Sequence, residues 1–167
     1  FEKDLEAGEV RLLKKEDGNW SVQFKQRLAK GKRIRSILGE NEFKSSQDDL
    51  KTLEMEGLFS FPKPVYLIKY LIHSVLRSGD ICVDFFSGSA TTAQSVMQLS
   101  AEYSGSLPIS YILVQLPENL DTSLKRSSSE NKSIIESDID FLDRLGYPHT
   151  LDYIGMERIK RAAKKIK

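Results

Sequence analysis

The sequence contains one cysteine and two histidines, and it lacks any long hydrophobic run. Cys82 alone cannot close an internal disulfide, and His73 and His149 do not complete a cluster with the spacing of a zinc site. No apolar stretch approaches the roughly 20 residues that span a bilayer, and the amino-terminal residues are acidic and polar, unlike a secretion signal. These absences argue against a disulfide scaffold, a metal site and a membrane partner, and we expect a cytoplasmic protein.

Neither sign of charge is in excess overall, because 25 basic residues stand against 24 acidic ones. A hydrophobic fraction of 40% in 167 residues is enough for a domain with a buried core. The charge is unevenly distributed, however: no acid lies between Asp17 and Glu40, and a second basic run occupies residues 158–167. Such runs can bind a nucleic-acid phosphate backbone or form solvated surfaces. The candidate nucleic-acid-binding residues are Lys25, Arg27, Lys30, Lys32, Arg33 and Arg35.

The amino-terminal part of the sequence predicts a small β-containing appendage. Apolar and polar residues alternate on both sides of Asp17-Gly18-Asn19, which predicts a β-hairpin within residues 9–26. Trp20 and Phe24 lie beside the first basic run and could contact a base or a sugar, but we expect them to pack on the apolar face of this hairpin. The stretch that follows is polar up to Phe59, and it predicts irregular structure with a short helix at about residues 47–56.

The rest of the sequence predicts an α/β arrangement. Helical spacing of apolar residues predicts a helix over residues 65–76. A buried strand at 80–86, a helix at 90–103 and a second buried strand at 109–116 then form a βαβ unit, which implies parallel strands. Further helices are predicted at 134–145 and 156–166. Cys82 lies inside the first strand, where we expect a buried and unreactive thiol.

The turn after the first of these strands carries the residues best suited to ligand binding. Its sequence, VDFFSGSATTAQ, places Asp84 at the end of a buried parallel strand, where ligands bind in open α/β sheets. Gly88 lets the backbone approach a ligand closely, and Ser87 and Ser89 can cap the next helix or donate to an anion. A tight turn without a ligand is the alternative that these residues leave open.

Two segments resemble the cofactor motifs of the DNA amino-methyltransferases that use S-adenosylmethionine. DFFSGSATTAQ is similar to their D-x-F-x-G-S-G-T-T motif, and FPKP is similar to the motif that precedes it in the permuted, or beta, arrangement. YILVQLPE and ERIKRA, further along the chain, add to the similarity. Residues 59–167 thus resemble the modification (Mod) subunit of type III restriction-modification systems, a family of site-specific adenine-N6 methyltransferases.

This resemblance implies a Rossmann-like α/β methyltransferase fold with a partial, mostly parallel sheet, and S-adenosylmethionine as the cofactor. Asp84 would hold the methionine amino group. Ser89, Thr91 and Thr92 would open the helix near the methionine carboxylate. The other cofactor residues that the resemblance implies are Phe61, Lys63 and Pro64 from the upstream motif and Phe85, Ser87 and Gly88 from the turn.

At two places the sequence departs from the family pattern. Many relatives have an acid at the end of the second strand that binds the ribose; here Gln115 takes that place, with Glu118 three residues later, and the choice between them stays open. Ala90 replaces the usual glycine. A positive φ at position 90 would strain the turn, whereas a first helical position would tolerate alanine.

The motif with which this family holds the target base, Asp/Asn-Pro-Pro-aromatic, is absent. The prolines lie at positions 62, 64, 108, 117 and 148, so no two are adjacent, and no catalytic residue is predicted. We therefore expect this chain, which begins with Phe1, to be the carboxyl-terminal part of a longer enzyme and to be inactive alone. Residues 1–58 would be the tail of a target-recognition region, and residues 59–167 the cofactor-binding part.

The partners that the resemblance implies are double-stranded DNA, a restriction (Res) subunit and a second Mod copy. Two other functions remain open. One is a non-catalytic module that binds nucleic acid or another protein and uses the turn only structurally. The other is a different S-adenosylmethionine-dependent methyltransferase, acting on RNA or protein, which would not be expected to carry FPKP ahead of the turn motif.

Overall fold

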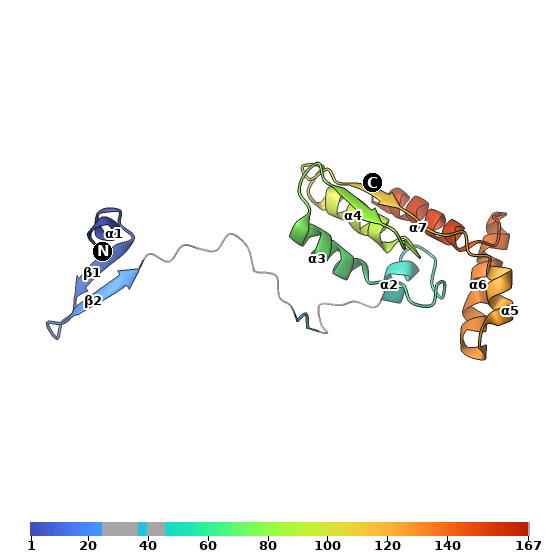
Figure 1. Cartoon of the computed structure of the whole chain (residues 1–167), viewed down its shortest axis with the longest axis horizontal. Coiled ribbons are helices and arrows are strands. Elements are labelled where there is room, and N and C mark those ends of the chain that lie inside the picture. The colour runs from blue at the N-terminus through green and yellow to red at the C-terminus, as the bar shows by residue number, and fades with distance from the viewer. Residues whose placement is uncertain (25–36, 40–45, 167) are drawn as a thin grey trace. The chain divides into compact units, whose positions relative to one another are not determined.

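The computed structural model describes residues 1–24, 37–39 and 46–166. Its contacts divide the chain into two compact units, Phe1–Ser36 and Ile37–Lys167 (Figure 1). The division of the sequence after residue 58, with a recognition region before it and a cofactor-binding part after it, stays a prediction. The six candidate nucleic-acid-binding cations, from Lys25 to Arg35, lie outside the described residues.

The first unit contains the predicted hairpin. Helix α1 (Glu2–Glu6) precedes strands β1 (Val10–Lys14) and β2 (Trp20–Phe24), which pair antiparallel with Lys14 opposite Trp20. In the turn, the Asp17 carboxylate accepts a hydrogen bond from the Asn19 backbone N–H at 2.9 Å. The packing expected for the two aromatic residues is not found: Trp20 is 63% exposed and Phe24 76% exposed. A two-stranded ribbon has too little surface to cover them.

The second unit contains the predicted βαβ arrangement. Its elements are α2 (Ser46–Lys51), α3 (Val65–Val75), β3 (Ile81–Asp84), α4 (Thr91–Glu102), β4 (Ser110–Leu113), α5 (Leu120–Arg126), α6 (Ser129–Leu145) and α7 (Leu151–Lys165). Helix α2 ends before the predicted end at residue 56, α7 begins before residue 156, and α5 was not expected. The remaining predicted helices and strands are present with shifted ends.

Strands β3 and β4 pair parallel, as the βαβ pattern predicted, and α4 connects them (Figure 1). Ile81 lies opposite Ser110, and Asp84 lies opposite Leu113. Helices α3 and α4 pack on one face of this pair of strands. The core on that face is formed by Ile72, Val96, Leu99 and Ile109, with Cys82 and Tyr111 packed against it.

A second core joins the segment after α2 to the carboxyl-terminal helices. Helix α5 packs against α6, and α7 packs against both α6 and α4 (Figure 1). The side chains of this core are Leu50, Leu53, Met55, Leu58, Leu120, Phe141, Leu142, Ile154 and Ala162. Residues 46–59, where the sequence predicted a short helix within a polar stretch, therefore supply four buried apolar side chains, which fix this stretch to the carboxyl-terminal helices.

The other face of the β3–β4 pair is uncovered. Ile81, Val83, Ile112 and Val114 alternate with covered residues and are 57%, 45%, 52% and 44% exposed. Parallel sheets normally carry helices on both faces, and two strands alone are marginally stable. The observed architecture is thus a mixed α/β arrangement with small sheets that fits a methyltransferase fold. Among the residues that the structure describes, no helix is long and apolar enough to cross a membrane.

Candidate functional site

Asp84 ends β3 at the carboxyl edge of the two parallel strands. Its Oδ2 atom accepts a hydrogen bond from the Thr92 hydroxyl at 2.6 Å, and its Oδ1 atom accepts one from the Phe86 backbone N–H at 3.0 Å. Asp84 is half-buried. The strand end and the first turn of α4 therefore hold a fixed negative charge where ligands bind in α/β sheets.

The turn after Asp84 is fixed by the end of β4. The Ser87 N–H donates to the Val114 carbonyl oxygen at 3.1 Å, and the Gly88 N–H donates to the Gln115 side-chain oxygen at 2.7 Å. Of the two alternatives that the sequence left open, Gln115 is therefore the one beside the turn. Glu118 is exposed, and its carboxylate accepts a hydrogen bond from the Ser123 hydroxyl at 2.8 Å.

Ala90 adopts the strained conformation that the sequence raised as one alternative. It precedes α4 with φ 58° and ψ 33°, in the left-handed region, and no side chain caps the helix there. This conformation costs an alanine about 1 kcal/mol or more relative to a right-handed one. Helix α7 packs directly behind the turn, because a Cβ atom added to Gly155 would lie 3.1 Å from the Gly88 carbonyl oxygen and 3.4 Å from the Ala90 Cβ atom.

The upstream FPKP segment lies against the start of α4. The Thr91 hydroxyl donates to the Lys63 carbonyl oxygen at 3.3 Å, and the Ser95 hydroxyl donates to the Val65 carbonyl oxygen at 3.2 Å. The two segments that resemble cofactor motifs are thus adjacent in space. Phe61, however, is 77% exposed, so the structure does not seat its ring against the turn.

Phe59, which the sequence reasoning missed, contacts the turn instead. A Cβ atom added to Gly88 would lie 3.0 Å from the Phe59 ring, so the ring packs on the glycine itself. Phe59 has a φ of 61°, and its N–H donates to the buried carboxylate of Asp138 on α6 at 3.0 Å. Burial raises the pKa of Asp138 to about 6, and the Phe59 N–H opposes that rise.

Arg158 on α7 is the second residue that the sequence reasoning misplaced. It belongs to the carboxyl-terminal basic run, which was interpreted as a solvated or phosphate-binding surface, but its side chain is fully buried. Its Nε atom donates to the Gln94 side-chain oxygen at 2.8 Å. Its Nη1 atom donates to the Ser89 hydroxyl at 2.9 Å, the Ser89 carbonyl oxygen at 3.1 Å and the Thr91 hydroxyl at 2.8 Å. The ERIKRA match was the signal that could have identified it.

Two other cations of the same run are also engaged within the fold. Arg161 pairs with Glu157 at 2.9 Å and donates to the Leu53 carbonyl oxygen at 3.0 Å. Lys165 donates to the Thr52 carbonyl oxygen at 2.8 Å. These side chains tie α7 to the segment after α2, so Arg158, Arg161 and Lys165 all have partners within the fold.

The chemistry of the turn suits a ligand group that carries both charges. The Asp84 carboxylate can accept from an ammonium group. The start of α4, with its free backbone N–H groups, the hydroxyls of Ser89 and Thr91 and the cation of Arg158 behind them, suits a carboxylate. Across residues 1–24, 37–39 and 46–166, no group of His, Cys, Asp or Glu side chains could hold a metal ion.

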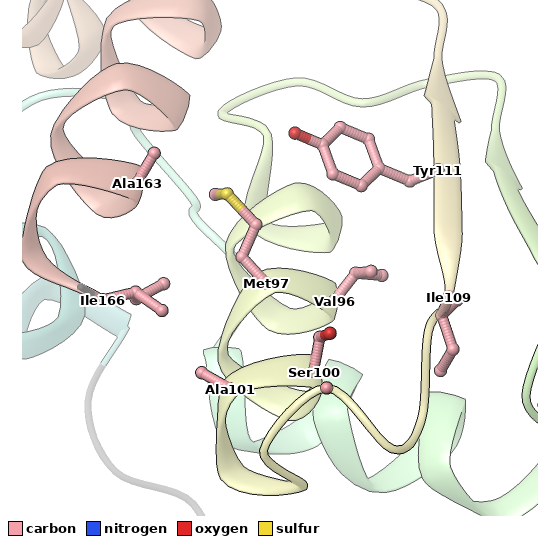
Figure 2. Close-up of a pocket in the computed structure, with 9 residues that line it drawn as sticks. Val96, Met97, Ser100, Ala101, Ile109, Tyr111, Ala163 and Ile166 are labelled. Carbon is pink, nitrogen blue, oxygen red and sulfur yellow. The ribbon is translucent and has the colours of Figure 1, made fainter.

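An apolar pocket of about 480 Å³ lies elsewhere, between α4, β4 and the end of α7 (Figure 2). Its lining includes Met97, Ile109, Tyr111 and Ile166, and none of the cofactor residues inferred from the sequence. Ile109 precedes β4, so the pocket lies toward the amino-terminal end of that strand, away from the edge where α/β sheets bind ligands. We therefore place the candidate site at the turn and not in this pocket.

Cys82 is half-buried on β3, less buried than expected. Burial, and to a smaller extent the charge of Asp84, raises the pKa of its thiol. A raised thiol pKa keeps the group protonated near neutral pH and therefore weakly nucleophilic, as expected from the sequence.

Comparison with known proteins agrees with the resemblance of the two motifs. Residues 6–167 match the DNA methylase family. The chain is 32% identical over 124 residues to the Mod subunit of the type III restriction-modification enzyme StyLTI from Salmonella typhimurium, and 34% identical over 122 residues to the Mod subunit of EcoPI from Escherichia phage P1. These matches cover 74% and 70% of this chain but only 16% and 19% of the two relatives. The match over nearly the whole chain shows that it belongs to the DNA methylase family.

Proposed function

We propose that the chain is the cofactor-binding part of a site-specific DNA adenine-N6 methyltransferase, the Mod subunit of a type III restriction-modification system. The family match and the two Mod relatives support this proposal. The observation that carries it is the position of Asp84, whose carboxylate lies at the carboxyl edge of the strands, 2.6 Å from the hydroxyl of Thr92 on α4.

S-adenosylmethionine, when bound, would supply the activated methyl group. Asp84 would bind its amino group, and Ser89 and Thr91 would bind its carboxylate together with the free N–H groups of α4. We assign the ribose contact to Gln115 in preference to Glu118, because Gln115 lies beside the Gly88 N–H and Glu118 bonds to Ser123. The cofactor residues that complete the proposed site are Phe61, Lys63, Pro64, Phe85, Ser87, Gly88 and Thr92.

The uncovered strand face supports a Rossmann-like fold of which this chain holds only part. Ile81, Val83, Ile112 and Val114 form an apolar surface of the kind that a helix layer covers in parallel sheets. The chain also lacks adjacent prolines, so the motif that holds the flipped adenine would come from another part of the enzyme. Alone, the chain would bind cofactor without methylating DNA.

The proposed partners follow from the same function. Double-stranded DNA would be the substrate, with the cations from Lys25 to Arg35 binding its backbone. A Res subunit and a second Mod copy would complete a type III enzyme, which would act in the cytoplasm.

Isothermal titration of the chain with S-adenosylmethionine tests the proposal. We expect binding heat that Asp84→Ala abolishes. Asp80→Ala is the matched control, because Asp80 precedes the other end of β3, where its carboxylate accepts from the Arg77 N–H at 2.7 Å. A module that uses the turn only structurally would give no heat, and that result would contradict the proposal.

A further inference from the structure

We propose that Arg158 is a positioning residue that makes the start of α4 selective for ligands with a carboxylate group. This role rests on the proposed function, because the carboxylate would be that of the methionine portion of S-adenosylmethionine. Arg158 would act through Ser89 and Thr91 and through its charge, without itself touching the ligand.

The first reason is an uncompensated buried charge. Arg158 is 0% exposed, and its Nη2 atom makes no hydrogen bond to any residue in the described part of the chain. The negative charge of Asp49 acts on the Arg158 guanidinium. However, the Oδ2 atom of Asp49 already accepts a hydrogen bond from the Val65 N–H at 2.8 Å. A buried cation without a paired anion is costly, and the nearby amino terminus of α4 adds further positive potential. An anion at the start of α4 would compensate both the charge of Arg158 and the positive potential of the helix amino terminus.

The guanidinium remains charged in spite of its burial. Burial lowers the pKa of Arg158 to about 10, and the charge of Asp49 opposes that fall. Arg158 therefore carries its charge near neutral pH. A positive charge that persists beneath a helix amino terminus favours an anionic ligand group over a neutral one.

The second reason is the orientation of two hydroxyl groups. Arg158 Nη1 donates to both Ser89 Oγ and Thr91 Oγ1. A hydroxyl that accepts from a guanidinium must direct its own hydrogen to another acceptor. The Thr91 hydroxyl can donate its hydrogen to the Lys63 carbonyl oxygen, but the two oxygen atoms are 3.3 Å apart, which is long for a hydrogen bond between oxygens. Ser89 Oγ and Thr91 Oγ1, both buried, also lie 3.3 Å apart, and either hydroxyl could donate to the other. Both internal bonds are long, so a ligand carboxylate at the start of α4, where no side chain caps the helix, would compete with them for the hydroxyl hydrogens.

A purely structural role for Arg158 makes a different prediction. Through Gln94 and Ser89 the side chain also connects α7 to α4. If that connection were its only role, removal of Arg158 would weaken every ligand of the turn to the same extent. A carboxylate-specific role instead weakens only those ligands that carry the carboxylate.

Calorimetric titration with two probes separates these roles. S-adenosylmethionine is compared with decarboxylated S-adenosylmethionine, which retains the sulfonium, the ribose, the adenine and the amino group. We expect the wild-type chain to prefer the carboxylated ligand about tenfold, as a charge-assisted contact provides. Arg158→Gln should reduce that preference to about one while leaving affinity for the decarboxylated probe nearly unchanged. Lys164→Gln, which removes an exposed cation from the same helix, should keep the preference.

Each other outcome overturns a specific statement. If Arg158→Gln binds both probes more weakly by the same factor, or keeps the wild-type preference for the carboxylated probe, the positioning role of Arg158 is overturned. The proposed function is not affected by either result. If circular dichroism shows that Arg158→Gln does not fold, Arg158→Lys replaces it, because lysine retains the charge but cannot bond both hydroxyls with a planar fork. We expect Arg158→Lys to lose part of the preference at constant affinity for the decarboxylated probe; equal loss for both probes overturns the role. Failure of the wild-type chain to bind either probe overturns the proposed function itself.

Discussion

The buried carboxylate of Asp138 on α6 accepts a hydrogen bond from the backbone N–H of Phe59 at 3.0 Å. Phe59 in turn packs its ring on Gly88. The two residues are far apart in the sequence, and their contact connects α6 to the turn after Asp84 through one aromatic side chain. The protonation state of Asp138 therefore bears on the position of the turn.

The first prediction concerns Asp138 and pH. Burial raises the pKa of Asp138 from its ordinary value of 3.8 to about 6, so the folded chain binds more protons than the unfolded chain between these values. The contribution of this group to the free energy of unfolding should fall by about 2 kcal/mol as the pH rises from 4 to 7, because the unfolded group is already largely ionised at pH 4. Asp138→Asn, which cannot ionise, should gain that amount relative to wild type over the same range.

Urea unfolding at pH 4 and pH 7 measures this difference. Asp140→Asn, at an exposed position on the same helix, is the control and should show little change relative to wild type. A constant difference in the free energy of unfolding between Asp138→Asn and wild type at the two pH values would contradict the burial of an ionisable carboxyl group.

The second prediction concerns Ala90. Ala90→Gly relieves a left-handed conformation worth about 1 to 2 kcal/mol and loses one buried methyl group worth about 0.8 kcal/mol, so the free energy of unfolding should rise slightly. Ala93→Gly, inside α4 and fully buried, should instead lower it by about 1 kcal/mol or more. Thermal unfolding compares the two variants. A loss of stability in both would show that position 90 is not strained.

The third prediction concerns His149, which bridges two helices. Its Nδ1 atom lies 3.1 Å from the Asp121 carboxylate and its Nε2 atom lies 2.8 Å from that of Asp143. Hydrogen bonds to Asp143 and then to Asp121 raise the pKa of His149. The stabilisation is therefore fully present below the unfolded pKa of 6.5 and is lost as the pH rises through the folded value.

A comparison of wild type with His149→Gln tests this sign. The loss of stability in the variant should be larger at pH 5.5 than at pH 8.5, measured by urea unfolding. A loss that is independent of pH would mean that the ion pairs contribute nothing to stability.

The fourth prediction separates the two ribose candidates. Gln115→Ala should weaken S-adenosylmethionine binding about tenfold, because Gln115 both lies at the turn and holds the Gly88 N–H. Glu118→Ala should change the affinity by less than about twofold. Calorimetric titration provides both values, and the reverse order of effects would assign the ribose contact to Glu118.

The sequence was sufficient to predict the local part of this fold. The apolar runs around Cys82 and Ile112, separated by a helical pattern, predicted the parallel βαβ unit, because period and composition are local properties. The motif between them predicted that Asp84 and Gly88 lie at the carboxyl edge of these strands, where α/β sheets bind ligands. The strain at Ala90 appeared only as an alternative, because no local signal determines the sign of φ there.

The parts that the sequence did not predict depend on long-range contacts. Arg158 belongs to a basic run by its neighbours in sequence, and its burial follows only from the packing of α7 against α4. Phe59 lies beyond the end of the short helix that the sequence predicted at about residues 47–56, so no periodicity marked it. Helix α5 is short, and Leu120 is its only buried residue, too weak a pattern to recognise.

Chemical-shift mapping of the ¹⁵N-labelled chain during titration with S-adenosylmethionine tests the central claim most directly. We predict the largest amide shifts at Asp84, Gly88, Ser89 and Gln115, with little change around Tyr111 and Ile166 in the apolar pocket. Shifts concentrated in that pocket, or no saturable shifts at the turn, would contradict it.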